Sequence, residues 1–213
     1  TSSKYLRHSK YLSLKVKDAI VDQLRDFHEG QRPSIDTRNP TVRIQIHINS
    51  NNVCSLAWDS SGQSLHKRGY RLSSVEAPAN EVLAAGMLLH SEWQKDTILI
   101  DPMCGSGTIL IEAALLATNT PPQIKQSHFG FMNWSNFDEA LWQEVVETAK
   151  SKITALKHPI LGYDKDINAI KATERNLQAI DLQDLVEVEW QELSKVKVDV
   201  SKGIVIMNPP YDE

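Results

Sequence analysis

Residues 97–117 read TILIDPMCGSGTILIEAALLA, and the fold class follows from the pattern of this stretch. The apolar run 97–101 ends in Asp101 and has the length of a buried β-strand. Two glycines follow in a short loop, and apolar residues then continue from Thr108 to Ala117, as in a buried helix. The sequence therefore predicts a strand, a tight loop and a helix that packs against the strand.

The same alternation continues through the rest of the chain. Three further apolar runs read as strands, at 159–164, 185–190 and 203–207. Three helical patterns accompany them, one starting at Pro78, one with an apolar face from Leu141 to Leu156, and one around 169–177. Strands that alternate with helices form parallel βαβ units. We therefore predict an α/β fold with a doubly wound, Rossmann-like sheet, which binds ligands at the carboxyl ends of its strands.

The N-terminal third has a different pattern and charge. Residues 1–71 carry 12 Lys and Arg against 6 Asp and Glu, a net charge of +6, whereas residues 72–213 carry 11 against 21, a net charge of −10. An amphipathic helix is predicted from Ser9 or Ser13 to Gly30, followed by paired strands at 42–48 and 53–59. We therefore divide the chain into a small basic α+β segment, 1–71, and an α/β domain, 72–213.

The basic segment favours a polyanionic partner, because phosphate contacts supply most non-specific affinity for nucleic acid. The alternative is a solvated basic surface with no partner. No stretch reaches the roughly 20 apolar residues that span a bilayer, and the N-terminus does not read as a signal peptide. Cys54 and Cys104 form no disulfide or zinc pattern, so we expect a cytoplasmic protein with reduced thiols and no bound metal.

The end of the first strand is the first candidate site. Its residues are Asp101, Pro102, Cys104, Gly105, Ser106 and Gly107. Glycines allow a ligand to approach the backbone, and the following helix presents its N-terminal amides. A dinucleotide fingerprint would require a third glycine where Leu110 stands, so the pyrophosphate signature is broken. A purely structural turn is the alternative.

The second and third strands also end in polar residues. Asp164, followed by Lys165, stands where an acid can accept both hydroxyls of a ribose. Asp166 is better interpreted as the N-cap of the next helix. Past the third strand, Glu192 is in phase to accept a hydrogen bond from an adenine amine, and Gln191 is its rival if the strand is shifted by one residue. A solvated Glu192 is a further alternative.

The fourth strand ends in Asn208, Pro209, Pro210 and Tyr211. The prolines remove backbone donors, which leaves the Asn208 side chain and the Pro209 carbonyl as acceptors beside an aromatic ring. Such a group suits a planar amine, because the acceptors take its two protons while the ring stacks on the attached base. The alternative is a simple loop breaker.

Together these motifs resemble the class I S-adenosylmethionine-dependent methyltransferases that modify exocyclic amino nitrogens. The segment APANEVLAAGML, residues 77–88, resembles the helix that precedes their first motif. The stretches NPTVRIQIHI and SLHKRGYR, at 39–48 and 64–71, are similar to the second half of a THUMP domain, an RNA-binding module. The combination resembles the THUMP-containing enzymes that make N2-methylguanine in large-subunit ribosomal RNA, often labelled as N6-adenine-specific DNA methylases.

The resemblance implies a role for each candidate residue. The Asp101–Gly107 loop would hold the methionine part of S-adenosylmethionine, Asp164 and Lys165 its ribose end, and Gln191 or Glu192 its adenine. Asn208 and Pro209 would hold the target amine close to the methyl group, and Tyr211, after Pro210, would stack on the base. The partner would be ribosomal RNA, bound through residues 1–71; the sequence does not predict the oligomeric state.

Three alternatives share these features in part. They are methylation of adenine N6 in DNA, methylation of a protein glutamine, and a non-catalytic RNA-binding module. The chain also departs from the family pattern, because Asp212 replaces a common glycine and the expected strands after the fourth are absent. We therefore expect a part of a longer protein.

Overall fold

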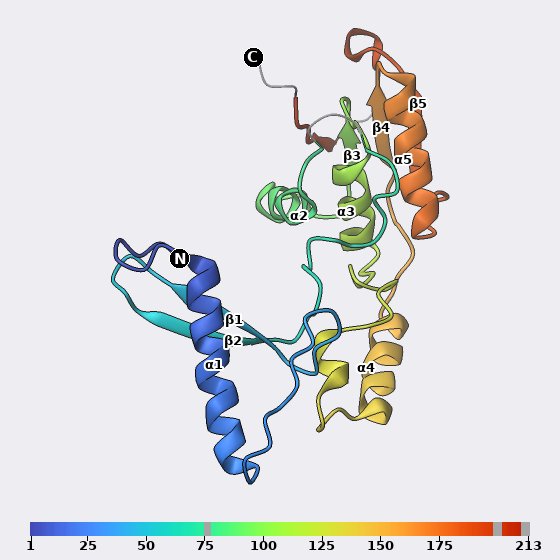
Figure 1. The fold of residues 1–213 in the computed structure, drawn as a ribbon. Helices are drawn as coiled ribbons and strands as arrows, with labels where there is room; N and C mark the ends of the chain where they lie inside the picture. Colours follow the sequence, from blue (N-terminus) through green and yellow to red (C-terminus); the bar gives the residue numbers. More distant parts are fainter. Residues whose placement is uncertain (75–77, 198–201, 210–213) are drawn as a thin grey trace. The chain divides into compact units, whose positions relative to one another are not determined.

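A computed structural model describes residues 1–74, 78–197 and 202–209 of the chain (Figure 1). Two compact units are present. The first consists of Thr1–Gln63 and His128–Phe137, and the second of Ser64–Ser127 and Asp138–Glu213. Pro210 and Tyr211, both expected in the site, lie outside the described residues.

The first unit contains the predicted helix and hairpin. Helix α1 spans Ser9–Phe27, and its N-cap is His8, not either of the two serines that we expected. Strands β1 (Arg43–Ile48) and β2 (Cys54–Asp59) pair antiparallel. Between them the Asn49 side chain accepts hydrogen bonds from two backbone amides, which closes the predicted turn.

A segment from far along the chain completes the first unit. The short 3-10 helix η1 (Gly130–Asn133) belongs to it. The Phe131 amide donates to the Ser60 carbonyl at 2.9 Å, and a Cβ on Gly130 would lie 2.9 Å from the Asp59 carbonyl oxygen. Trp134 meets Trp58 edge to face, with ring centroids 5.7 Å apart. Residues 128–137, which we assigned to the α/β domain, therefore pack against the hairpin.

The second unit is built on a parallel four-stranded sheet. Its strands are β3 (Ile98–Asp101), β4 (Ile160–Asp164), β5 (Val186–Trp190) and β6 (Gly203–Val205), in the order β5-β4-β3-β6 (Figure 1). All three strand pairs are parallel. The chain moves outward from β3 to β5 and returns to the other side of β3 with β6. Sheets of this kind bind ligands where the order reverses, beyond the carboxyl ends of the strands.

Three helices share a core with one face of this sheet. They are α2 (Glu81–His90), α3 (Thr108–Ala117) and α5 (Ile167–Ala179). Leu99, Ile160 and Val186 point to this face, whereas Ile98, Ile100 and Tyr163 form a smaller cluster on the other. The alternation of neighbouring residues between the two faces is the expected behaviour of a strand buried on both sides.

The remaining elements of the second unit are α4 (Glu139–Ser151) and the 3-10 helix η2 (Leu193–Lys195). Helix α4 ends at Ser151, so Ile153 and Leu156, which we expected on the same helix, lie beyond its end. No helix in the described part of the chain is both long and apolar enough to cross a membrane.

The predicted fold class, an α/β domain with a doubly wound parallel sheet beside a small α+β segment, is confirmed. The units do not divide at residue 71, however. Residues 64–71 belong to the second unit, because Tyr70 is only 1% exposed and lies in the same core as α3.

Candidate functional site

The loop after β3 adopts left-handed backbone conformations, which favour glycine. Gly105 and Gly107 have φ values of +57° and +82°. A Cβ on Gly107 would also lie 2.6 Å from the Cγ2 atom of Thr173, so α5 packs directly against the loop. Helix α3 starts immediately afterwards, at Thr108. The N-terminal amides of α3 therefore lie beside a loop that approaches its neighbours closely.

The ends of β3 and β4 are joined by hydrogen bonds. The Gly105 amide donates to Oδ2 of Asp164 at 2.9 Å, and the Cys104 amide donates to the Tyr163 carbonyl at 2.9 Å. Oδ1 of Asp164 accepts from the Asp166 amide, also at 2.9 Å. Each carboxylate oxygen has two acceptor positions, so Asp164 fixes the loop and retains positions for a ligand.

Asp101 is the most buried acid of the site. It is 1% exposed, and its Oδ1 accepts a hydrogen bond from the Met103 amide at 3.1 Å. Burial raises the pKa of Asp101 to about 7; the Met103 amide opposes this rise and the charge of Asp164 adds to it. Asp101 can therefore change its protonation state near neutral pH.

The thiol of Cys104 is buried within the loop. Its Sγ lies 3.9 Å from the Thr173 hydroxyl, and burial above all raises the pKa of this thiol. It therefore stays neutral, and Cys104 contributes its backbone amide and its packing to the site.

The end of β5 lies next to Asp164. The Gln191 amide donates to the Asp164 carbonyl at 2.9 Å, while the Gln191 side chain donates to the Lys195 carbonyl. Glu192 is exposed and pairs with Lys195 at 3.3 Å. The Lys165 carbonyl accepts from the Trp190 indole at 2.8 Å, and the Lys165 side chain is exposed. The structure thus brings both rivals for the adenine contact, Gln191 and Glu192, to the same strand end.

The fourth motif follows β6. Val205 lies beside Ile100 in the register, and the Ile206 amide extends this pairing by donating to the Ile100 carbonyl at 3.0 Å. Asn208, half-buried, and Pro209, exposed, therefore begin at the same sheet edge as the loop after β3. The predicted residues on the four strands, as far as they are described, meet at one edge.

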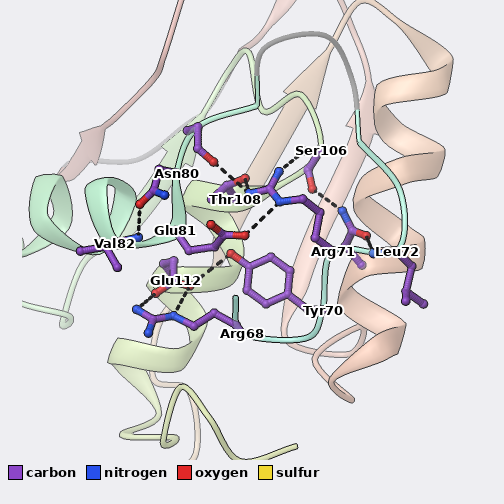
Figure 2. Close-up of polar contacts among 12 residues, drawn as sticks. Arg68, Tyr70, Arg71, Leu72, Asn80, Glu81, Val82, Ser106, Thr108 and Glu112 are labelled. Carbon is purple, nitrogen blue, oxygen red and sulfur yellow. Dashed lines mark hydrogen bonds and ion pairs between the residues drawn. The ribbon is translucent and has the colours of Figure 1, made fainter. Parts of the chain in front are cut away.

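A second set of contacts supports the loop. Arg71 donates hydrogen bonds to Glu81, to Ser106 in the loop and to Thr108 at the start of α3 (Figure 2). Asn176 of α5 donates to the Ser106 carbonyl at 2.9 Å, and the Thr173 hydroxyl donates to the Gly105 carbonyl at 2.9 Å.

Sequence reasoning missed these supporting residues. Thr173 and Asn176 are polar positions on the otherwise apolar face of α5, where 169, 170, 172 and 177 are also buried. Glu112 likewise interrupts the apolar run of α3. A buried polar residue requires a partner, and this was the signal that could have found them.

Site and fold define a class: a Rossmann-like α/β domain with a polar ligand site at the carboxyl ends of four parallel strands. Residues 68–213 match the model of the RMKL-like methyltransferase domain, and residues 2–56 match the model of the THUMP domain. The chain therefore belongs to the RMKL-like methyltransferase-domain family and carries a THUMP sequence in front of that domain.

Among curated relatives, the ribosomal RNA large subunit methyltransferase K/L of Shewanella baltica (strain OS195) is 38% identical over 98% of this chain and 30% of its own length. The K/L methyltransferase of Cellvibrio japonicus (strain Ueda107) is 40% identical over 98% of this chain and 29% of its own length. The chain thus spans about 30% of the length of these relatives.

Solved structures show the same arrangement. SMU.472, named as a methyltransferase and solved complexed with SAH, superposes with a TM-score of 0.86 at 33% identity, over 98% of this chain and 54% of its own. A protein of Listeria monocytogenes str. 4b F2365, named as a predicted N6-adenine-specific DNA methylase, superposes with a TM-score of 0.83 at 31% identity, over 93% and 52%.

Proposed function

We propose that the protein transfers a methyl group from S-adenosylmethionine to an exocyclic amino nitrogen of a base in RNA, namely guanine N2 of 23S ribosomal RNA. The observation that carries the proposal is the meeting of the Asp101–Gly107 loop, Asp164 and Asn208 at one edge of the sheet. The THUMP match and the names of the K/L relatives favour ribosomal RNA over other substrates.

The residues at the edge suit this cofactor. Asp164 retains acceptor positions for ribose hydroxyls. The loop from Asp101 through Pro102, Cys104, Gly105 and Ser106 to Gly107 would hold the methionine end, Lys165 would lie by the ribose, and Gln191 or Glu192 would accept from the adenine amine. When bound, the cofactor supplies a methyl group on a positively charged sulfur.

The target amine would be held by the fourth motif. Its two protons would be accepted by the Asn208 side chain and the Pro209 carbonyl, which favours a pyramidal nitrogen whose lone pair faces the methyl group. The nitrogen would use its lone pair to take the methyl group that the bound cofactor supplies; the sulfur would keep the electron pair of the broken bond, and one amine proton would then pass to solvent. Pro210 would set the direction of the chain and Tyr211 would stack on the base, two roles that fall outside the described residues. Positioning supplies most of the rate.

The first unit would contact the RNA. It contains a polar cavity of about 230 Å³ with both Arg38 and Arg43 among its lining residues. Arg38 makes no ion pair within the described part of the chain. By contrast, Arg68 and Arg71 are paired with Glu112 and Glu81, so we no longer assign these two arginines to RNA. Reduced cysteines and a ribosomal substrate favour the cytoplasm.

The test is methyl transfer by the full-length protein with labelled cofactor. We expect label on undermodified 23S RNA at guanine N2, and an Asn208→Ala variant should lower kcat by about 100-fold or more. Label on adenine N6 of DNA, with none on RNA, would overturn the choice of substrate but leave the cofactor site standing. Binding of RNA without binding of S-adenosylmethionine would support the non-catalytic alternative.

A further inference from the structure

The segment 68–73, at the start of the sequence that matches the methyltransferase domain, makes two anchors within the second unit (Figure 2). At the first, Nε of Arg68 lies 3.3 Å from Oε1 of Glu112, and the Tyr70 hydroxyl donates to the same oxygen at 3.1 Å. Glu112 lies in the interior of α3 and is 2% exposed. This anchor ties the segment to the core; within the described part of the chain, the hydrogen bonds of the Arg68 and Tyr70 side chains go to Glu112 and Leu65 and not to the glycine loop.

The second anchor is Arg71, which does reach the loop. Nε donates to Oε1 of Glu81 at 2.9 Å, and Nη1 donates to the Ser106 hydroxyl at 3.3 Å. Nη2 donates to the Thr108 hydroxyl at 3.1 Å and to the Ala79 carbonyl at 2.9 Å. One guanidinium therefore joins the start of α2, the loop and the first residue of α3. A planar group with several fixed donors is suited to this task, whereas an ammonium is a single point of attachment.

Asn176 of α5 also links the segment to the glycine loop. It is fully buried and makes four hydrogen bonds. Its Oδ1 accepts from the Leu72 and Ser73 amides, and its Nδ2 donates to the carbonyls of Ser73 and Ser106. Ser106 is thus held at two points. Its hydroxyl accepts from Arg71, and its carbonyl, which precedes Gly107, accepts from Asn176.

We infer that Arg71 is a positioning residue for the cofactor loop: it acts through Ser106 and Thr108, not by touching the substrate. The inference rests on the proposed cofactor site. Burial makes the contact effective, since Arg71 and Glu81 have side chains that are 23% and 7% exposed. Supporting groups that fix a binding loop to within a fraction of an ångström determine how well it binds.

A matched pair of substitutions separates this role from simple stability. Arg71→Lys and Arg68→Lys each keep a positive charge beside a buried glutamate, so both variants should fold. A lysine at 71 cannot serve Glu81, Ser106 and Thr108 together. We expect Arg71→Lys to weaken SAH binding by about tenfold. In Arg68→Lys the SAH affinity should stay within about twofold of the wild-type value. Both expectations hold even if either substitution lowers Tm. Thr108→Val, which removes only one acceptor of Arg71, should weaken SAH binding by roughly threefold.

The measurements are SAH titration calorimetry and amide hydrogen exchange of the full-length protein without ligand. Exchange of the peptide spanning 102–109 should accelerate in Arg71→Lys and stay unchanged in Arg68→Lys. Unaltered exchange and affinity in Arg71→Lys would overturn the inference alone, as would equal losses in both lysine variants. A wild-type protein that binds no SAH would instead overturn the proposed cofactor site and, with it, this inference.

Discussion

The Gly105 amide donates a hydrogen bond of 2.9 Å to Oδ2 of Asp164, although 59 positions separate the two residues in the chain. This bond joins the loop after β3 to the end of the neighbouring strand β4. The acid that we assign to the cofactor ribose is therefore also a structural partner of the loop that we assign to the methionine end. This hydrogen bond thus links the two halves of the proposed cofactor site directly.

Replacement of Asp164 tests this double role. In Asp164→Asn one acceptor becomes an NH2 donor that faces either the Gly105 or the Asp166 amide, so we expect a loss of about 1–3 kcal/mol in the free energy of unfolding. SAH affinity should fall as well. Asp166→Asn is the control, because asparagine caps a helix as well as aspartate does. Urea unfolding and calorimetry measure both effects; equal behaviour of the two variants would contradict the assignment.

Gly107→Ala should be strongly destabilising. The residue would retain a φ of +82°, and its Cβ would meet Thr173 at 2.6 Å, so strain and overlap together should cost about 2–4 kcal/mol in unfolding free energy. Adding Thr173→Ser removes the overlapping methyl group and should restore part of the lost unfolding free energy, measured by urea unfolding. No recovery in the double variant would contradict the contact.

Gly86→Ala is the matched control. Gly86 lies within α2 with open space around it, so this substitution should instead stabilise the protein by about 0.5–1 kcal/mol.

The raised pKa of Asp101 predicts a pH dependence of stability. The unfolded chain ionises this carboxyl near 3.8, and the folded protein only near 7. The folded protein thus binds this proton more tightly than the unfolded chain does. The resulting contribution of Asp101 to the free energy of unfolding is fully present below about pH 4 and is lost as the pH rises to about 7. Relative to Asp101→Asn, which can still accept from the Met103 amide, the wild type should lose on the order of 2–4 kcal/mol over this range. Urea unfolding from pH 4.5 to 8 checks this, and parallel profiles would refute it.

The cavity in the first unit predicts where salt-dependent RNA binding resides. Alanine at Arg38 or Arg43, both among its lining residues, should weaken RNA binding and lower the slope of log affinity against log salt by roughly one per residue, as for phosphate contacts. Arg175→Ala, an exposed change on α5, is the control in the second unit. Filter binding at several salt concentrations measures the slopes. Equal slopes in all variants would exclude this cavity from the RNA contact.

Much of the fold could be predicted from the sequence because its signals are local. The continuous apolar run before Asp101 indicated a strand buried on both faces, and the alternation of strands with helices predicted the parallel sheet. The polar residues after each strand indicated the site, since the carboxyl ends of parallel strands must lie at one edge.

Which side chains are partners across long distances in the chain is visible only in three dimensions. Residues 128–137 pack against the hairpin of the first unit, and Arg68 and Arg71 bind buried carboxylates, although composition placed both arginines on an RNA-binding surface. The Asn176 side chain accepts a hydrogen bond from the Leu72 amide, 104 positions away in the chain. Periodicity reports whether a residue faces a core, but it carries no information on which distant group satisfies a buried donor. That pairing is determined by the three-dimensional arrangement, because buried polar groups must find their partners wherever the fold brings them.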